Sequence, residues 1–278
     1  MNDKRNAPIG VFDSGVGGLT VVLEMLKQLP EESFIYYADT AHVPYGPRDP
    51  EELRGFADRI TEFLVKQGCK MIIIACNTST SLSYDLLKQK YDLPLVGVIE
   101  PGVDKALEAT ANKKIGIFAT QATVNSGVFQ RMLKAKSPET EVTAQSCPLF
   151  VPYVEAGVIS GQEIEKAVRL YYRPLQEKGV DSLILGCTHY PFLLPVISYV
   201  TGPGVQIINP ARETVSRAAE ILRELNIQAE TGRQPEHNYF VSGNPEQFRK
   251  LGSMFLQQDI GKVEKNTLFM QDQDCQTY

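Results

Sequence analysis

Residues 68–78 read GCKMIIIACNT, and residues 179–189 read GVDSLILGCTH. In both stretches a glycine precedes a short apolar run, which ends in a small residue and a cysteine at the same spacing. Apolar runs of this length, bounded by turn residues, are typical of strands buried in a parallel sheet. We therefore expect two similar buried strands that end at Cys76 and Cys187.

A second pair of similar stretches lies upstream of these strands. Residues 9–14 read IGVFDS and residues 115–120 read IGIFAT, so that Thr120 takes the place of Ser14. Two matched pairs in the same order indicate an internal duplication. Because ligands bind at the carboxyl ends of parallel strands, two facing halves would bring both cysteines to one cleft.

The rest of the chain alternates β-branched runs with amphipathic stretches, the pattern of parallel sheets covered by helices. One helix is signalled by Asp49 as its N-cap and Pro50 in its first turn, and it should end at Gly68. Another should cover residues 19–26 and end before Pro30. Strands are expected at residues 9–12, 34–38, 71–75, 95–98, 114–119, 182–186 and 205–208.

The predicted fold class is α/β, with two similar parallel-sheet α/β domains related by pseudo-twofold symmetry and the active site in the cleft between them. We place the first domain at residues 1–98 and 210–278 and the second at residues 99–209. A helix over residues 213–225 and the run 238–242 would return the chain to the first domain. The polar tail, residues 257–278, should be peripheral.

Composition narrows the classes of function. The chain has 28 Lys and Arg against 33 Asp and Glu, a net charge of −5, which disfavours nucleic acid or an anionic membrane surface as partner. A small-molecule substrate is the better expectation. Residues 1–8 are polar, and no segment approaches the roughly 20 apolar residues of a membrane span, so we expect a cytoplasmic protein without a signal peptide.

The five cysteines are too scattered for a structural framework. They are odd in number and contain no C-x-x-C pair, which argues against disulfides and a zinc ribbon. Cys69, Cys147 and Cys275 have no motif around them and are interpreted as core residues. Reduced thiols are thus available for chemistry at Cys76 and Cys187.

The glycine-rich stretch 13–18, DSGVGG, is a poor phosphate loop. Thr20 stands where a dinucleotide fingerprint needs its third glycine, Asp13 would repel a pyrophosphate, and no Gly-Lys-Ser/Thr follows as in a P-loop. Glycines suit a tight turn, but the turn leaves Asp13 and Ser14 without a role. We interpret this pair as part of a site.

Cys76 and Cys187 should each lie where a strand meets a helix, whose positive N-terminal end favours a thiolate. Such thiols could exchange protons near neutral pH. The residues leave alternatives open: a thiol hydrolase with His189 as base, a zinc site of Cys76, Cys187 and His189, or an amino-acid-binding protein without catalysis. A pyridoxal phosphate enzyme is disfavoured because no lysine stands in these motifs.

Four motifs stand in order along the chain: residues 13–18 (DSGVGG), 44–46 (PYG), 75–78 (ACNT) and 186–191 (GCTHYP). Together they resemble the motifs of bacterial glutamate racemases in the aspartate/glutamate racemase family. In aspartate racemases, the nearest alternative, the last motif resembles Gly-Cys-Thr-Glu, whereas this chain has His189 at the fourth position.

The resemblance implies a cofactor-independent racemase with two bases, which acts on glutamate and supplies D-glutamate for peptidoglycan and cell shape. It makes Cys76 and Cys187 the acid and base, with neither metal nor cofactor, and is compatible with a homodimer. It adds three assisting residues: Asp13, His189 and Glu155. It implies a substrate-binding set, to which we add Thr120 from the repeat: Asp13, Ser14, Tyr45, Gly46, Asn77, Thr78, Thr120, Thr188 and His189.

Overall fold

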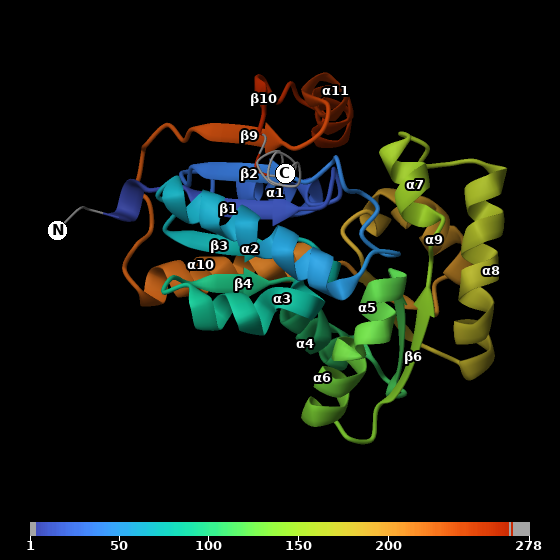
Figure 1. Ribbon diagram of the computed structural model, residues 1–278. Coiled ribbons are helices and arrows are strands. Elements are labelled where there is room, and N and C mark those ends of the chain that lie inside the picture. The colour runs from blue at the N-terminus through green and yellow to red at the C-terminus, as the bar shows by residue number, and fades with distance from the viewer. Residues whose placement is uncertain (1–3, 267, 269–278) are drawn as a thin grey trace, which may run out of the picture.

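The computed structural model describes residues 4–266 and 268, whose strands form two parallel sheets (Figure 1). The first sheet has the order β10-β9-β2-β1-β3-β4, and the second has the order β6-β5-β7-β8. The predicted α/β class with two parallel-sheet domains is confirmed. The strands are β1 (Ile9–Asp13), β2 (Phe34–Ala38), β3 (Met71–Ile74), β4 (Leu95–Gly97), β5 (Lys114–Ala119), β6 (Glu141–Ser146), β7 (Ser182–Gly186), β8 (Gln206–Ile208), β9 (His237–Val241) and β10 (Val263–Lys265).

The two sheets repeat one arrangement of strands. The order β2-β1-β3-β4 in the first matches β6-β5-β7-β8 in the second, so β1 corresponds to β5 and β3 to β7. These are the strands whose sequences match. Val11 lies opposite Ile73 in the first sheet, as Ile117 lies opposite Ile184 in the second. The internal duplication is therefore visible in the topology as well as in the sequence.

Helices cover both faces of the first sheet, because its inner strands are apolar on both sides. On one face lie α1 (Leu19–Gln28), α10 (Pro210–Glu224) and α11 (Pro245–Leu256); on the other lie α2 (Pro50–Lys66) and α3 (Asn77–Lys90). The α2 helix begins as predicted, since the Asp49 side chain accepts the backbone N–H groups of Glu51 (2.8 Å) and Glu52 (3.4 Å).

The second sheet is covered in the same way and stands beside the first (Figure 1). The helices α4 and α6 pack on one face, and α7, α8 and α9 on the other, while the short α5 contacts α3 of the first half. Their bounds are α4 (Ile99–Ala109), α5 (Gln121–Ser126), α6 (Val128–Lys136), α7 (Phe150–Glu155), α8 (Gln162–Lys178) and α9 (Leu194–Thr201).

The chain passes between the sheets twice, from β4 into α4 and from β8 into α10. The two helices that follow these passages pack against each other, and Gly102 of α4 faces the ring of Pro210 at the start of α10. The predicted domain limits at residues 98 and 210 stay a prediction.

The expected list of strands was incomplete. It lacked β6 and β10, which are edge strands whose residues are largely polar and partly exposed, so they show no buried apolar run. The tail is also less peripheral than predicted, because Ile260 is buried and β10 pairs with β9. The tail's remaining part and Cys275 lie outside the described residues.

Candidate active site

Side chains at the carboxyl ends of β1, β3 and β7 converge between the two sheets. Asp13 ends β1, Cys76 follows β3 and Cys187 follows β7. The hydroxyl of Thr188 donates to Asp13 Oδ1 at 3.0 Å, which joins the second half directly to the first. The two strand-end cysteines therefore share a neighbourhood, as expected for ligand sites in α/β sheets.

Asp13 organises the glycine-rich loop that follows it. Its Oδ2 accepts the backbone N–H groups of Gly15 (3.1 Å) and Gly18 (3.0 Å), so the carboxylate holds a turn, as the loop's glycines indicated, and also faces the other half. Asp13 is fully buried. Burial raises its pKa, while His189 and these hydrogen bonds lower it.

The glycines in this loop permit close contact between the two halves. A Cβ atom at Gly17 would overlap the ring of His189 and lie 2.6 Å from Thr188 Oγ1. At Gly18 it would lie 2.6 Å from Cβ of Asp13. The loop therefore allows the backbone after β1 to reach the segment after β7.

Cys76 occupies the N-cap position of α3, as predicted. Its Sγ accepts the backbone N–H of Ser79 at 3.5 Å. The expected acidity, however, is wrong for this geometry: burial, followed by the charge of Asp13, raises the pKa of the Cys76 thiol to about 12. Since the side chain is only 4% exposed, loss of solvation outweighs the helix end, and Cys76 is a neutral thiol here.

Cys187 lies in a different local structure from Cys76. A helix follows the strand as predicted, but Cys187 does not cap it, because the next element is the 3-10 helix η2 (Tyr190–Leu193), whose N-cap is His189. The sulfur of Cys187 instead lies 3.7 Å from Nδ1 of His189. On the far side of the imidazole, Nε2 lies 2.6 Å from Glu155 Oε1, which also accepts the N–H of Val16 at 3.0 Å.

The series of contacts from Glu155 through His189 to Cys187 places a cation beside the sulfur of Cys187. Burial alone would lower the pKa of His189, but its hydrogen bonds to Cys187 and Glu155 and their negative charges raise it well above the usual value. An imidazolium held between a carboxylate and a sulfur follows from this arrangement. The Glu155 side chain, which sequence alone could equally have placed on a helix surface, thus contacts the site.

The two cysteines interact electrostatically. A charge on Cys187 raises the pKa of Cys76, so a second negative sulfur in the site is disfavoured. One thiolate and one thiol is the arrangement that this coupling favours.

Threonine hydroxyls link the halves on the Cys76 side. Thr78 Oγ1 lies 2.9 Å from Thr120 Oγ1 and 3.3 Å from Thr123 Oγ1, and the last two lie 3.0 Å apart. Thr78 belongs to α3, whereas Thr120 caps α5. The neighbouring Asn77 has a buried Oδ1 without a hydrogen-bonding partner among the described residues. Polar groups with spare bonding capacity thus lie beside Cys76.

Tyr45 and Gly46 lie on the loop after β2. The Tyr45 hydroxyl donates to Asp39 Oδ2 at 2.6 Å, and its ring packs in one cluster with Cys76. At Gly46 a Cβ atom would lie 3.3 Å from Cβ of Thr120, so this loop also reaches the second half.

The structure brings the residues predicted for the site together. Ser14 is buried in the loop after Asp13. Three residues beside the site escaped the sequence analysis: Asp39, Ser79 and Thr123. Asp39 follows the end of β2 as Asp13 ends β1, a signal that could have been read, whereas Ser79 and Thr123 sit inside helices with no motif of their own.

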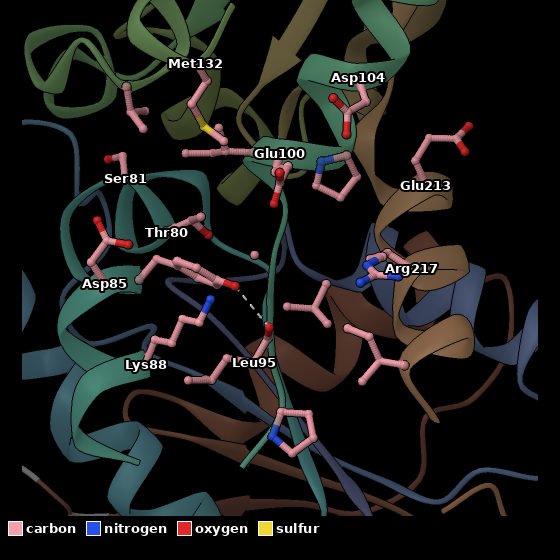
Figure 2. Close-up of a pocket in the computed structure, with 18 of the residues that line it drawn as sticks. Thr80, Ser81, Asp85, Lys88, Leu95, Glu100, Asp104, Met132, Glu213 and Arg217 are labelled. Carbon is pink, nitrogen blue, oxygen red and sulfur yellow. Dashed lines mark hydrogen bonds between the residues drawn. The ribbon is translucent and has the colours of Figure 1, made fainter. Parts of the chain in front are cut away.

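A separate groove of about 1120 Å³ lies at the passages between the sheets (Figure 2). Figure 2 shows Lys88 of α3, Glu100 and Asp104 of α4 and Arg217 of α10 around it. Neither Cys76 nor Cys187 lines this groove. The converging strand ends are therefore the candidate active site, and the groove is not.

Comparison with known proteins shows the family of this chain. Residues 9–218 match the family of Asp/Glu/hydantoin racemases. The chain belongs to that family. A glutamate racemase of Corynebacterium diphtheriae is 45% identical over 94% of this chain and 98% of its own length.

Solved racemase structures share the whole fold. The crystal structure of a glutamate racemase from Bacillus anthracis has a TM-score of 0.89 and 34% identity, covering 94% of this chain and 97% of that one. That of Francisella tularensis glutamate racemase in complex with D-glutamate also has a TM-score of 0.89, with 35% identity over 95% of this chain and 99% of that one. The resemblance predicted from the four motifs is confirmed, and the chain is a racemase-family isomerase that acts on a small molecule.

Within the described residues, no helix combines the length and the apolar character that a membrane span requires.

Proposed function

We propose that this protein interconverts L- and D-glutamate, with Cys76 and Cys187 as the two proton-exchanging groups. The observation that carries the proposal is the convergence of the two strand-end sulfurs, each with different hydrogen-bonding partners, at a site built by both halves. The relatives that are 45% and 34–35% identical are glutamate racemases, which favours glutamate over aspartate as the substrate.

In the proposed reaction the Cα of glutamate lies between the sulfurs. One cysteine, as thiolate, removes the Cα proton, and the electron pair of the broken C–H bond moves toward the substrate carboxylate. The other cysteine, as thiol, donates its proton to the opposite face of Cα. The configuration is inverted, and the two sulfurs have exchanged protonation states.

The groups around each sulfur suit unequal roles. Cys76 is a buried neutral thiol, ready to donate, while the imidazolium of His189 lies beside Cys187 and is held by Glu155. Asp13 holds the glycine-rich loop against Thr188. Asp13, His189 and Glu155 would thus assist the two cysteines without exchanging the Cα proton themselves.

Donors near Cys76 would hold the substrate and make its Cα proton more acidic. The proposed binding set is the predicted one: Asp13, Ser14, Tyr45, Gly46, Asn77, Thr78, Thr120, Thr188 and His189. Hydrogen bonds to the substrate carboxylate stabilise the negative charge that develops as the proton leaves. Burial of the site strengthens these interactions.

The test is proton exchange at Cα. The purified protein, with no added cofactor, is incubated with either enantiomer of glutamate in deuterium oxide. We expect deuterium to be incorporated at Cα and the optical rotation to fall to zero, whichever enantiomer is the starting material. Binding of glutamate without exchange would instead identify a binding protein, and a covalent acyl-enzyme seen by mass spectrometry would identify a thiol hydrolase. A parallel assay with aspartate decides the substrate.

The cellular setting belongs to the same proposal. We propose a cytoplasmic enzyme that supplies D-glutamate for peptidoglycan, acts without nucleic acid or membrane and assembles as a homodimer. Light scattering of the purified protein tests the assembly: a mass of one chain would rule out the homodimer.

A further inference from the structure

The hydroxyl of Ser79 is a buried polar group that the proposed reaction has not used. Ser79 lies in the first turn of α3, is 0% exposed, and donates its backbone N–H to Cys76 Sγ at 3.5 Å. Its Oγ has no hydrogen-bonding partner among the described residues. An unpaired buried hydroxyl is destabilising, so a functional partner is worth seeking.

The two hydroxyls that follow Ser79 in the helix are both hydrogen-bonded. Thr80 donates to the carbonyl of Cys76 at 2.9 Å, and Ser81 donates to the carbonyl of Thr78 at 2.8 Å. Serine and threonine in helices commonly make such backbone bonds. Ser79 makes no such bond among the described residues, so its proton is free to turn toward another acceptor.

The sulfur of Cys76 is the acceptor within reach. Burial, Asp13 and Cys187 raise the pKa of the Cys76 thiol, whereas the backbone N–H and the side chain of Ser79 lower it, so that side chain lies within reach of the sulfur. A neutral thiol accepts hydrogen bonds weakly, whereas a thiolate accepts them strongly. The hydroxyl would therefore gain its partner only when Cys76 loses its proton.

The matching position in the second half is different. Three residues after Cys187 stands Tyr190, whose hydroxyl donates to the carbonyl of Cys147 at 3.2 Å and has its pKa raised by burial and by the neighbouring Cys187. The sulfur of Cys187 also lies 3.7 Å from Nδ1 of His189, and Thr78 takes the place of this histidine in the first half. The sulfur of Cys187 thus has an imidazole beside it, whereas the sulfur of Cys76 has a backbone N–H and a hydroxyl from its own helix.

We propose that Ser79 is a positioning residue for Cys76. When Cys76 acts as the base, Ser79 donates both its backbone N–H and its hydroxyl to the sulfur. This inference rests on the proposed function of Cys76. It requires that the proton of Cys76 leaves during turnover and that Ser79 holds the resulting thiolate in line with the substrate.

The variant Ser79→Ala removes the hydroxyl and keeps the N–H. We expect kcat/KM for glutamate to fall about tenfold, the cost of one hydrogen bond to a charged group. The acid limb of its pH profile should move up by about one pH unit, since a tenfold change corresponds to one unit of pKa. Both enantiomers have the same free energy in water, so kcat/KM has to fall equally for both.

Ser83→Ala is the matched control. Ser83 lies one turn further along α3, is also buried, and its hydroxyl also has no partner among the described residues, but it does not contact Cys76. Its variant should retain the wild-type pH profile. An equal fall in both variants would mean that loss of any buried hydroxyl from α3 disturbs the site, and would overturn the assignment.

A second measurement follows the ionisation of the Cys76 thiol in the absence of turnover. Iodoacetamide labelling at a series of pH values, with the Cys76 peptide followed by mass spectrometry, reports its thiolate. The midpoint should rise in Ser79→Ala and stay unchanged in Ser83→Ala. The other titratable groups around this sulfur remain the same in both variants: Asp13, Tyr36, Tyr45 and Cys187.

The two measurements separate this inference from the proposed function. If the wild-type protein does not racemise glutamate, the proposed function fails, yet labelling still shows whether Ser79 acts on Cys76. If racemisation proceeds and Ser79→Ala matches the wild type in both labelling and pH profile, Ser79 has no role and the inference is overturned.

Discussion

The groups in contact with each sulfur, at the scale of single residues, decide what the two cysteines can do. Cys76 has a helix N-terminus but is so buried that its pKa rises to about 12. Cys187 has an imidazolium beside it, stabilised by Glu155. At Cys76, burial outweighs the backbone N–H of Ser79, which lowers the pKa.

Replacing either sulfur by oxygen should stop the reaction. Cys76→Ser and Cys187→Ser should each lower kcat by several orders of magnitude, because a hydroxyl is a far weaker acid than a thiol of pKa about 8.5. Circular-dichroism assay of racemisation measures the loss. Cys69→Ser, which alters a buried cysteine without a site neighbour, is the control, and near-normal turnover of a site variant would remove that cysteine from the mechanism.

Glu155→Gln keeps an oxygen for the Val16 N–H but removes the charge that faces His189. The pKa of His189 should fall, because Glu155 is one of the groups that raise it. The imidazolium then loses its proton at lower pH, so the alkaline limb of kcat/KM should shift down and activity should drop about tenfold.

The control for this variant is Glu163→Gln, at an exposed carboxylate of α8 paired with Lys166. It should match the wild-type protein. An unchanged alkaline limb in Glu155→Gln would show that Glu155 does not govern the charge of His189.

Loops at the ends of strands, at the scale of elements, carry the contacts between the halves at the active site. The segment after β1 reaches Thr188 and His189, and the loop after β2 brings Gly46 to Thr120. Two backbone segments can approach each other this closely only where the residue at the contact has no side chain. The glycines after β1 thus serve packing between elements rather than a phosphate.

Gly17→Ala should separate these elements. Its Cβ would overlap the His189 ring and press on Thr188, and overpacking of this kind costs roughly 1–3 kcal/mol. We expect kcat/KM to fall at least about tenfold while the protein remains folded by circular dichroism. Gly55→Ala in α2, where the nearest atom to the added Cβ is 3.8 Å away, should leave activity unchanged. Full activity of Gly17→Ala would contradict a tight contact.

The relative placement of the two sheets, at the scale of the whole molecule, is set by apolar packing that includes both halves, by the two passages of the chain and by polar contacts across the site. The chain passes between them twice, and hydroxyl and carboxylate contacts connect them across the site. The helices α4 and α10 pack together where the chain passes, with Gly102 facing Pro210. A substitution there should alter the activity although the substituted residue does not contact the active site.

Gly102→Ala tests this coupling. The added Cβ would lie 2.9 Å from Cγ of Pro210, so the two helices have to move apart. We expect a loss of about 1–3 kcal/mol in thermal unfolding and a lower kcat at temperatures where the variant is folded. Gly204→Ala, with nothing within 4 Å of the new atom, is the control. A destabilised variant with normal kcat would show that the passages only support the fold.

Local pattern alone predicted most of the fold. The strands β1, β3, β5 and β7 are apolar and bounded by turn residues, and α2 carries its own capping signal, so each could be read from neighbouring residues. The edge strands β6 and β10 could not, because half of their surface faces solvent and their sequence is polar. Motifs shared between the halves also located both cysteines.

Sequence by itself thus determined the class of fold and the repeated design and supplied the residues proposed for the site, since all of these depend on short-range patterns. Tertiary structure alone decided their chemistry. Burial turned the expected acidic thiol of Cys76 into a weak acid, and folding placed Glu155 against His189 and an unpaired Ser79 hydroxyl beside a sulfur. Solvation and charge at a site depend on what packs around it, and those neighbours come from distant parts of the chain.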